Sequence, residues 1–228
     1  MAADTVVVPP LPGGPRVTAF FTTKRMNGDL DAVARLMQVP VRDVYLPIQK
    51  HTDKVVVLDF GREPRIADAV ITHRTAVVIG VQVADCVPIL LYDPQRRVAG
   101  AVHAGWRGTA EMILKKTIEA MAARFSSSPA DIMVAVGPSI KGCCYEVGPE
   151  VAEAVEKATG SGAYCGKRGE KYHLDLPEAN RLQALSMGVL PEQVWVSGDC
   201  TFCLPDKYFS YRFSKGSTGR QCAFIAML

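Results

Sequence analysis

A cysteine and a histidine flank two neighbouring apolar runs in the middle of this chain. Residues 84–109 read ADCVPILLYDPQRRVAGAVHAGWRGT. Cys86 comes just before the first run, 87–92. His103 follows the second run, 98–102, and a tight turn separates the two runs. We expect an antiparallel strand pair, whose outer ends lie side by side. A thiol and an imidazole held together in this way can form a metal site or a nucleophile–base pair.

A second imidazole comes from His51, which follows a separate extended segment. Two histidines and one cysteine suit zinc in the three-ligand arrangement that leaves a fourth position for water or substrate. His51, Cys86 and His103 are therefore candidate zinc ligands and candidate catalytic residues. Asp85, beside Cys86, is a candidate acid–base residue or hydrogen-bond support for a ligand. Taken singly, each of these residues has an equally common interpretation as a packed residue, so the hypothesis depends on the whole set.

A candidate anion site comes directly after His103. The chain turns from strand to helix at Gly105, and Arg107, Gly108 and Thr109 follow at once. Free backbone N–H groups at a helix start, together with an arginine, can hold a phosphate. The Gly-Lys-Ser/Thr of a Walker loop is absent, so this is not a P-loop. The alternative interpretation is an ordinary turn between a strand and a helix.

Most of the cysteines lie outside this candidate site. Their total is seven, an odd number, so reduced thiols are expected rather than a disulfide framework. Cys200 and Cys203 form a CxxC pair, and Cys143 and Cys144 are adjacent. A structural zinc site with four thiolate ligands is one interpretation. A thioredoxin-like redox pair is less favoured, because no helix start follows Cys200. Four unlinked thiols near the core are the favoured interpretation.

Composition and charge narrow the class of protein. The 228 residues are 48% apolar, and the formal net charge is +3 with no basic run. These values favour a globular protein with a sizeable core and argue against nucleic acid as a partner. No apolar segment reaches the ~20 residues of a membrane helix, and the start lacks signal-peptide features. We therefore expect a cytoplasmic protein that acts on a small molecule, as a monomer or a weak homodimer.

Strands dominate the predicted elements, with helices between them. Strands are expected at 17–23, 54–60, 67–71, 76–83, 87–92, 98–102, 131–136, 194–197 and 221–227, with short extended segments at 44–48 and 172–176. Helices are expected at 30–37 after an Asp29 cap, at 109–125, at 149–159, and from Pro177 to Gly188, with a surface loop at 160–171. The pattern predicts one α/β or α+β domain over residues 1–228, with 1–15 as a loose arm.

Several motifs together resemble one protein family. They are QKHTDKV (49–55), ADAVIT (67–72), ADCVPILLYD (84–93), VAGAVHAGWRGT (98–109), GPSIKGCCYEVG (137–148), YHLDLPEAN (172–180), SGDCTFC (197–203) and FSYRFSKGSTGRQCAFI (209–225). In this order they resemble the YfiH-like or laccase-domain family, once labelled polyphenol oxidase. The resemblance runs from about residue 44 to the end of the chain.

The resemblance implies a fold, a metal site and an activity. The fold would be a YfiH-like sandwich of mixed β-sheets flanked by helices, shared with toxins of the cytotoxic-necrotizing-factor type. The family's zinc ligands would correspond to His51, Cys86 and His103. Members are described as purine nucleoside enzymes, which carry out phosphorolysis of adenosine, inosine, guanosine and methylthioadenosine, and deamination of adenosine. The resemblance therefore implies a zinc-dependent transferase and hydrolase that uses a purine nucleoside and phosphate.

Three other functions compete with this one. Some bacterial members are described as peptidoglycan editing factors that act on a wrongly incorporated serine in a muropeptide precursor. That role suits a cysteine hydrolase with Cys86 as nucleophile and His103 as base. The nucleophile role conflicts with zinc binding, because a coordinated thiolate is not free to attack. Copper-dependent phenol oxidation is disfavoured, since four histidines cannot supply a blue-copper centre and several further coppers. A binding module without catalysis is the remaining alternative.

One segment departs from the family's pattern. Members usually carry an Arg-Gly-Gly loop and then an Asn-Arg helix before the Q-x-H motif. Here residues 21–38, FTTKRMNGDLDAVARLMQ, look shortened. Lys24 or Arg25 would stand in for the loop arginine, which makes Arg25 a candidate substrate-binding residue.

Overall fold

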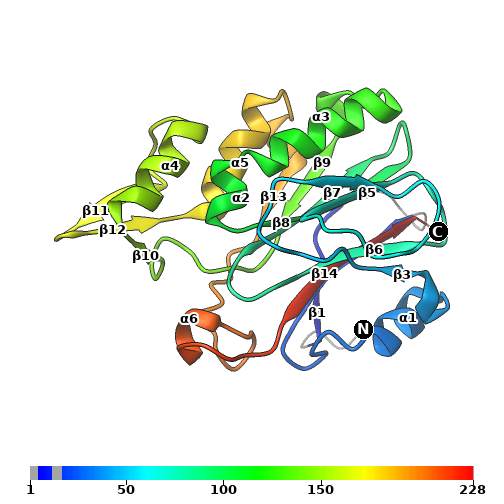
Figure 1. The fold of residues 1–228 in the computed structure, drawn as a ribbon, viewed down its shortest axis with the longest axis horizontal. Coiled ribbons are helices and arrows are strands. Elements are labelled where there is room, and N and C mark those ends of the chain that lie inside the picture. Colours follow the sequence, from blue (N-terminus) through cyan, green and yellow to red (C-terminus); the bar gives the residue numbers. More distant parts are fainter. Residues whose placement is uncertain (1–4, 12–16, 228) are drawn as a thin grey trace.

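Two large β-sheets stacked face to face form the centre of the molecule. The structure is a computed structural model that describes residues 5–11 and 17–227. Helices cover the outer face of each sheet, so the layers follow the order helix, sheet, sheet, helix (Figure 1). This arrangement confirms the predicted α/β fold of layered mixed sheets flanked by helices. Within the described residues, no helix has both the length and the apolar character that crossing a bilayer requires.

The first sheet carries most of the candidate site. Its strand order is β13-β9-β7-β8-β5-β4. The strands are β4 (Val55–Val57), β5 (Ala69–Thr72), β7 (Val87–Asp93), β8 (Val98–Ala104), β9 (Met133–Val136) and β13 (Val194–Val196). Strands β7 and β8 pair antiparallel with Pro88 opposite His103, so Cys86 and His103 lie at the same end of the pair. The predicted juxtaposition of this thiol and this imidazole is confirmed.

The second sheet closes the other side of the core. Its order is β1-β2-β14-β6-β3, with the last strand of the chain in the middle. The strands are β1 (Val6–Val7), β2 (Val17–Thr22), β3 (Val44–Tyr45), β6 (Val78–Val83) and β14 (Gln221–Met227). Of the expected N-terminal arm, residues 1–4 and 12–15 lie outside the described residues. Val6 and Val7, within that arm, pair with β2.

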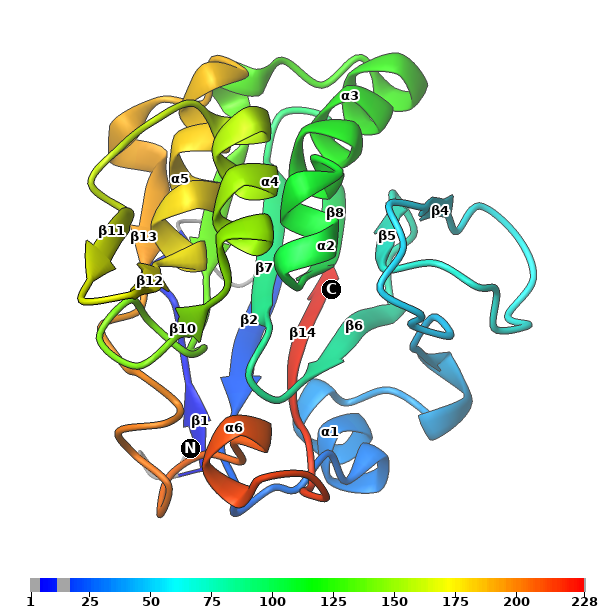
Figure 2. The ribbon, with the colours of Figure 1, turned by 60° about the vertical axis from the view of Figure 1, so that its left-hand side comes forward.

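Helices lie on both outer faces of the sheet pair. Helices α2 to α5 cover the six-stranded sheet and α1 covers the five-stranded one (Figure 2). The helices are α1 (Leu30–Met37), α2 (Trp106–Ala110), α3 (Ile113–Phe125), α4 (Pro149–Thr159), α5 (Leu176–Ser186) and α6 (Tyr211–Ser214), with short 3-10 helices at Val41–Asp43, Pro129–Asp131 and Pro191–Gln193. Asp29 caps α1 as predicted, because its carboxylate accepts hydrogen bonds from the backbone N–H groups of Asp31 and Ala32.

Strands β7 and β8 are buried on both faces. Leu90 and Ala101 face the second sheet, whereas Leu91 and Val102 face the helices. Successive side chains of a strand point to opposite faces, so a strand covered on both sides must be apolar at every position. This double burial explains the uninterrupted apolar runs in the sequence. It also explains why polar chemistry concentrates at the strand ends.

The predicted helix over 109–125 is wrong in its first part. Two helices, α2 and α3, replace it, and the break falls at Glu111 and Met112. Met112 adopts a left-handed conformation with φ of 59°, which interrupts the helical path. Its side chain is 37% exposed. The sequence concealed the break because Met is a good helix former and no glycine marks the position.

The predicted surface loop at 160–171 is wrong in part, whereas the extended segment expected at 172–176 is confirmed over the length of β12 (Lys171–Leu174). Strand β11 (Cys165–Arg168) lies within the predicted loop and forms a hairpin with β12. The hairpin turns at Gly169, whose φ is +63°, and β12 also pairs with β10 (Glu146–Val147) to make a three-stranded sheet. Most of β11 is exposed to solvent. It therefore lacks the apolar alternation from which a strand is predicted.

Gly80 of β6 provides a test of the sheet packing. A Cβ at this position would lie 2.5 Å from the carbonyl oxygen of Ala223 and 2.5 Å from the ring of Phe224, both on β14. We expect Gly80→Ala to lower the free energy of unfolding by about 1–3 kcal/mol, as overpacking of a core does. Urea denaturation measures the difference. Gly166→Ala is the matched control, since its Cβ would meet nothing within 4 Å. Equal losses in both variants would contradict the packing described here.

Candidate metal centre and active site

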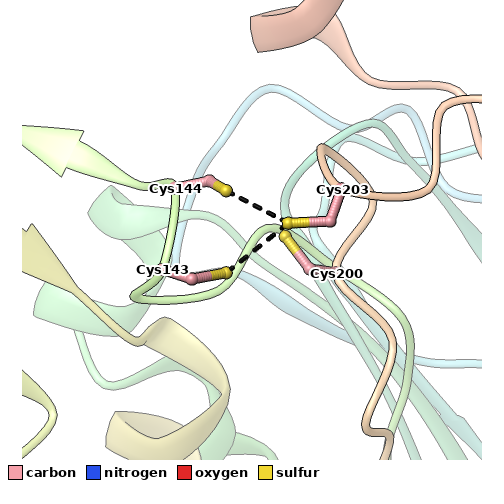
Figure 3. Close-up of side chains that lie close together, drawn as sticks. All are labelled: Cys143, Cys144, Cys200 and Cys203. Carbon is pink, nitrogen blue, oxygen red and sulfur yellow. Dashed lines mark hydrogen bonds between the residues drawn. The ribbon is translucent and has the colours of Figure 1, made fainter.

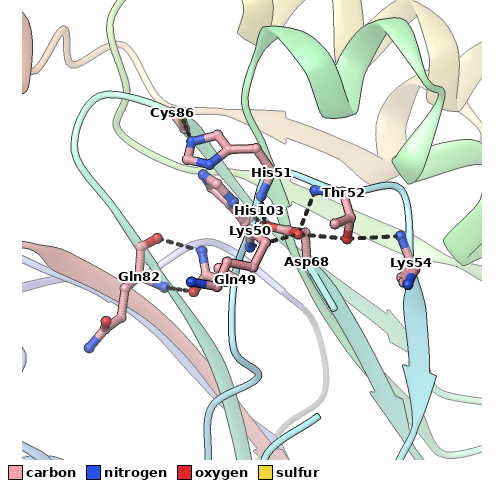
Figure 4. A network of polar contacts seen from close by, with 9 residues as sticks. All are labelled: Gln49, Lys50, His51, Thr52, Lys54, Asp68, Gln82, Cys86 and His103. Carbon is pink, nitrogen blue, oxygen red and sulfur yellow. Dashed lines mark hydrogen bonds and ion pairs between the residues drawn. The ribbon is translucent and has the colours of Figure 1, made fainter. Parts of the chain in front are cut away.

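Side chains from three distant segments meet at one end of the β7–β8 pair. His51 comes from the loop before β4, Cys86 precedes β7, and His103 is the penultimate residue of β8. One donor atom from each residue lies within 4.8 Å of the other two. The Cys86 Sγ atom is 3.9 Å from His51 Nε2. The structure thus brings together all three predicted ligands (Figure 4).

Asp68 holds two of these residues in place. It lies just before β5 and is fully buried. Its Oδ1 atom is 2.8 Å from Nδ1 of His103 and accepts a hydrogen bond from the backbone N–H of His51 at 3.0 Å. Its Oδ2 atom accepts bonds from the backbone N–H groups of Lys50 and Thr52 and from the Thr52 hydroxyl (Figure 4). One carboxylate therefore fixes both the ring of His103 and the loop that carries His51.

These contacts keep Asp68 charged. Burial would raise the pKa of its carboxyl, but hydrogen bonds from His103, Thr52 and Lys50 outweigh burial and hold the pKa well below its usual range. Sequence reasoning missed this residue. The available signal was an acid inside the otherwise apolar stretch 66–71, since a buried acid requires partners.

The thiol and imidazole of the site shift each other's ionisation. Burial would raise the pKa of Cys86, but hydrogen bonds from His103 and His51 lower it from 9.0 to about 6. Burial would lower the pKa of His103, but hydrogen bonds with Asp68 and Cys86 raise it to about 9. In the metal-free protein at neutral pH, Cys86 is therefore a thiolate beside a protonated His103.

The donor set fits a divalent metal ion. Because Nδ1 of His103 is bound to Asp68, its Nε2 atom is free to serve as a ligand, which is the usual carboxylate–histidine–metal arrangement. His51 and Cys86 add one nitrogen and one sulfur donor. Gly105 permits the close approach, since a Cβ there would lie 3.0 Å from the Cys86 Sγ atom and 3.3 Å from the His51 ring. Three protein donors leave a position for a substrate atom, as in catalytic zinc sites.

Two cavities meet at this cluster. The first, of about 420 Å³, is lined by His51, Ala84, Asp85, Cys86, Ile140, Tyr145, Leu176, Tyr211, Arg212 and Arg220. The second, of about 340 Å³, is lined by Pro47, Ile48, Gln49, His51, Gln82, Val83, Ala84, Cys86, His103 and Arg220. Both fall within the ~300–1,000 Å³ range of small-molecule sites. His51, Cys86 and Arg220 belong to both cavities, so the candidate metal centre lies at their junction.

Asp85 lines the first cavity, but both of its carboxylate oxygens are engaged. Oδ1 accepts a hydrogen bond from the hydroxyl of Thr201 at 2.6 Å, and Oδ2 accepts one from the backbone N–H of Arg212 at 2.8 Å. Its carbonyl accepts a bond from the N–H of Ile140. Asp85 thus ties three segments of the cavity wall together. This geometry favours its support role over an acid–base role.

The predicted anion-binding residues lie away from the two central cavities. Thr109 is fully buried, and its hydroxyl accepts a hydrogen bond from Asn180. Gly108 is buried within α2, and exposed Arg107 stacks on Trp106 with 4.5 Å from its guanidinium carbon to the ring centroid. Arg25 lines a separate hollow with Thr23, Asp206 and Lys207. Of this group, the structure places none in the walls of the two central cavities.

Other cationic and aromatic residues occupy that place. Arg212 and Arg220 line the first cavity, together with Tyr145 and Tyr211. Burial raises the pKa of Tyr145 to about 12, so its hydroxyl stays protonated at neutral pH. Sequence reasoning did not single out these four residues, although all lie within motifs of the family pattern. Nothing in their spacing along the chain distinguishes these four residues from surface residues.

The four cysteines of the two pairs are free thiols, as expected, but they gather at one place, and Cys143 and Cys203 are exposed rather than near the core. The sulfur atoms of Cys143, Cys144, Cys200 and Cys203 all lie within 4.8 Å of one another. Two loops bring them together, because Ser139 and Cys200 form an isolated parallel bridge between the loops. The sequence does not show that pairing, since no strand marks either loop. The other histidines, His73 and His173, belong to neither donor cluster.

Known proteins resemble this chain over most of its length. Residues 23–228 match the family described as "Multi-copper polyphenol oxidoreductase laccase". The purine nucleoside phosphorylase YlmD of Bacillus subtilis is 38% identical over 72% of this chain, which spans only 59% of that relative. The adenosine deaminase RL5 of an unknown prokaryotic organism is 36% identical, covering 82% of this chain and 76% of that protein. The crystal structure of YfiH from Bacillus licheniformis superposes with a TM-score of 0.92 at 28% identity, covering 100% and 98% of the two chains.

The lowered pKa of Cys86 has a measurable consequence. Thiolates, not thiols, react with alkylating reagents. In protein stripped of metal, alkylation of Cys86 by iodoacetamide should therefore be half-maximal near pH 6 rather than near pH 9. Peptide mass spectrometry after timed labelling measures the profile. His103→Ala removes the hydrogen bond that lowers this pKa most, so its midpoint should rise. A wild-type midpoint near 9 would refute the described thiolate.

Asp68 should govern metal affinity without binding metal. In Asp68→Asn the side chain keeps its shape but loses the charge that orients His103. Loss of such a support typically costs 10–100-fold in metal affinity, and we expect that loss here. Competition with a chelator measures the zinc affinity. The ion of this centre is identified as the one that the Cys86→Ala variant no longer binds. Asp53→Asn is the control, because Asp53 lies in the same loop but pairs with Lys116. Unchanged zinc affinity in Asp68→Asn would contradict the assigned role.

Proposed function

We propose that this chain, which belongs to the multi-copper polyphenol oxidoreductase laccase family, is a zinc-dependent purine nucleoside enzyme. Its reactions would be phosphorolysis of adenosine, inosine, guanosine and methylthioadenosine, and deamination of adenosine. The names of relatives, a purine nucleoside phosphorylase and an adenosine deaminase, support this proposal. The observation that supports the proposal most directly is the cluster of His51, Cys86 and His103 at the junction of two cavities.

In this proposal the three clustered residues hold one zinc ion. Zinc in a three-ligand site supplies Lewis-acid chemistry to a substrate atom. Asp68 orients His103 by accepting a hydrogen bond from its Nδ1–H group, which keeps Nε2 available as a ligand atom. Both reactions require a purine nucleoside to be polarised next to the open coordination position of the metal. One site therefore serves both.

The first cavity suits the nucleoside. Ile140 and Leu176 give it apolar walls, and the rings of Tyr145 and Tyr211 offer surfaces for a purine. The Tyr145 hydroxyl, whose pKa burial raises to about 12, is a neutral hydrogen-bond donor there. Phosphorolysis needs such a donor, because the departing purine must gain a proton or a hydrogen bond at a ring nitrogen.

Arg212 and Arg220 are the proposed phosphate-binding residues. Both line the first cavity, and Arg220 also lines the second, next to the candidate metal centre. A guanidinium can bind phosphate through two parallel hydrogen bonds. Asp85 positions Arg212 through the backbone bond at Oδ2. Arg107 adds a more distant positive charge. Burial raises the pKa of Tyr145, and the charge of Arg107 acts in the opposite direction.

Copper oxidase chemistry is a poor match to the donors. Multicopper oxidation requires a blue-copper centre and further coppers with several imidazoles. The chain has four histidines in all. In the part of the chain that the structure describes, two metal-capable clusters occur, and the second contains cysteines alone. We therefore propose zinc, despite the copper in the family's description.

A cysteine hydrolase is the second candidate function. Asp68, His103 and Cys86 form a continuous chain of contacts, which is also the order of orienting acid, base and nucleophile in hydrolases. Such an enzyme would edit a misincorporated serine in a muropeptide precursor. His51 argues against it, because a second imidazole against the thiol has no role in such a triad. Metal removal separates the two candidates, since a hydrolase keeps full activity without metal and zinc catalysis stops.

The remaining parts of the proposal concern setting and assembly. The proposed assembly is a monomer or a weak homodimer. All seven cysteines are unbridged, which suits a reducing compartment such as the cytoplasm.

Two ligand variants test the proposed function. We expect His51→Ala and Cys86→Ala each to lower nucleoside turnover by at least ~100-fold, as loss of a positioned catalytic group does. Chromatography of products from adenosine and inosine, with and without phosphate, measures both reactions. His73→Ala is the control histidine, because it lies outside the cluster and is about half-exposed. Thermal unfolding verifies that the variants are folded. Full turnover in both ligand variants would refute the site.

A further inference from the structure

Four cysteine side chains converge from two loops beside the candidate active site. Cys143 and Cys144 lie in the loop between β9 and β10, and Cys200 and Cys203 lie between β13 and α6 (Figure 3). The Cys203 Sγ atom is 3.2 Å from that of Cys144 and 3.8 Å from that of Cys143. All four sulfurs lie within 4.8 Å of one another. No histidine and no carboxylate belongs to this cluster.

The sulfur spacing is that of a shared metal ion. With Zn–S bonds of about 2.3 Å, the edges of a tetrahedron of sulfurs are about 3.8 Å. The sulfur–sulfur distances of 3.2 Å, 3.8 Å and at most 4.8 Å bracket this length. They are well above the ~2.05 Å of a disulfide. A single disulfide would also explain the approach of only two of the four residues.

The backbone prepares the site before any ion binds. Ser139 and Cys200 form a parallel bridge, and the N–H of Thr201 donates to the carbonyl of Ser139 at 3.1 Å. The two loops are thus held in register with their sulfurs facing each other.

We propose that Cys143, Cys144, Cys200 and Cys203 bind one structural zinc ion, separate from the His51/Cys86/His103 centre. A tetrahedral set of four sulfurs favours zinc or iron–sulfur chemistry. Four thiolates close the coordination sphere and leave no position for substrate, which is the mark of a structural site.

The bound ion would fasten one wall of the first cavity. Thr201, between the two cysteines of the CxxC pair, donates to Asp85 at 2.6 Å. Ile140, before the adjacent pair, donates to the Asp85 carbonyl. Tyr145, directly after Cys144, lines the cavity itself. The cluster therefore joins the two loops that brace Asp85 and shape the proposed nucleoside pocket.

Metal content tests this inference. Protein is expressed with zinc supplied, purified under reductant, and analysed for zinc and iron per chain by plasma mass spectrometry. We expect the double variant Cys143→Ser/Cys203→Ser to hold one zinc fewer than wild type. Cys165→Ser, whose thiol lies in neither cluster, is the matched control and should hold the wild-type amount. Equal zinc in the double variant and wild type, or iron in place of zinc, would overturn the proposal.

Cobalt substitution in Cys86→Ala keeps the test decisive even where the double variant fails to fold. This variant lacks one ligand of the active-site cluster, so one cobalt per chain should remain, with the strong thiolate charge-transfer absorption of a tetrahedral four-sulfur site. A metal-free Cys86→Ala protein would overturn the inference, as would a Cys144–Cys203 disulfide found by mass spectrometry in its place. The result is independent of the proposed nucleoside activity, whose failure would leave this cobalt signal unchanged.

Discussion

A single buried carboxylate, that of Asp68, is the constraint on which the site depends. A fully buried charge is costly unless it is paired and hydrogen-bonded. Here the partners that satisfy it are the His103 ring and the backbone of the loop at residues 50–52. The requirement to satisfy one acid therefore becomes the geometric link between two candidate ligands. Loss of the carboxylate would leave the ring without orientation and the loop without an anchor.

The sheet supplies the remaining positions. Strand β8 lies between β7 and β5, so Cys86, His103 and Asp68 come from three adjacent strand ends. The backbone N–H of His103 donates to the carbonyl of Asp68 at 2.7 Å, which locks the relative register of these ends. Rigid, doubly covered strands keep such positions within a fraction of an ångström. The loops that carry Tyr145 and the four clustered cysteines, together with Arg212 of α6, add the wall of the cavity.

The sequence predicts the centre of this arrangement but not its supports. Apolar runs bounded by Cys86 and His103 are sufficient to place the thiol beside the imidazole, because strand pairing is local and regular. The contacts of Asp68 depend on a loop that no periodicity describes. The cysteine pairs meet through an isolated bridge at Cys200, which pattern reasoning does not see. A family motif predicts Arg25 at the site, but Arg25 lines a separate hollow. The cavity instead has Arg212 and Arg220, which a linear pattern does not distinguish from surface charges.

The central claim is that His51, Cys86 and His103 hold one metal ion between two cavities. Anomalous diffraction from crystals of the zinc-loaded protein, recorded on both sides of the zinc absorption edge, tests it most directly. The account predicts an anomalous peak bonded at about 2.0–2.3 Å to a ring nitrogen of each histidine and to the cysteine sulfur. A map without a peak at these three residues, in crystals that show zinc elsewhere, would contradict it.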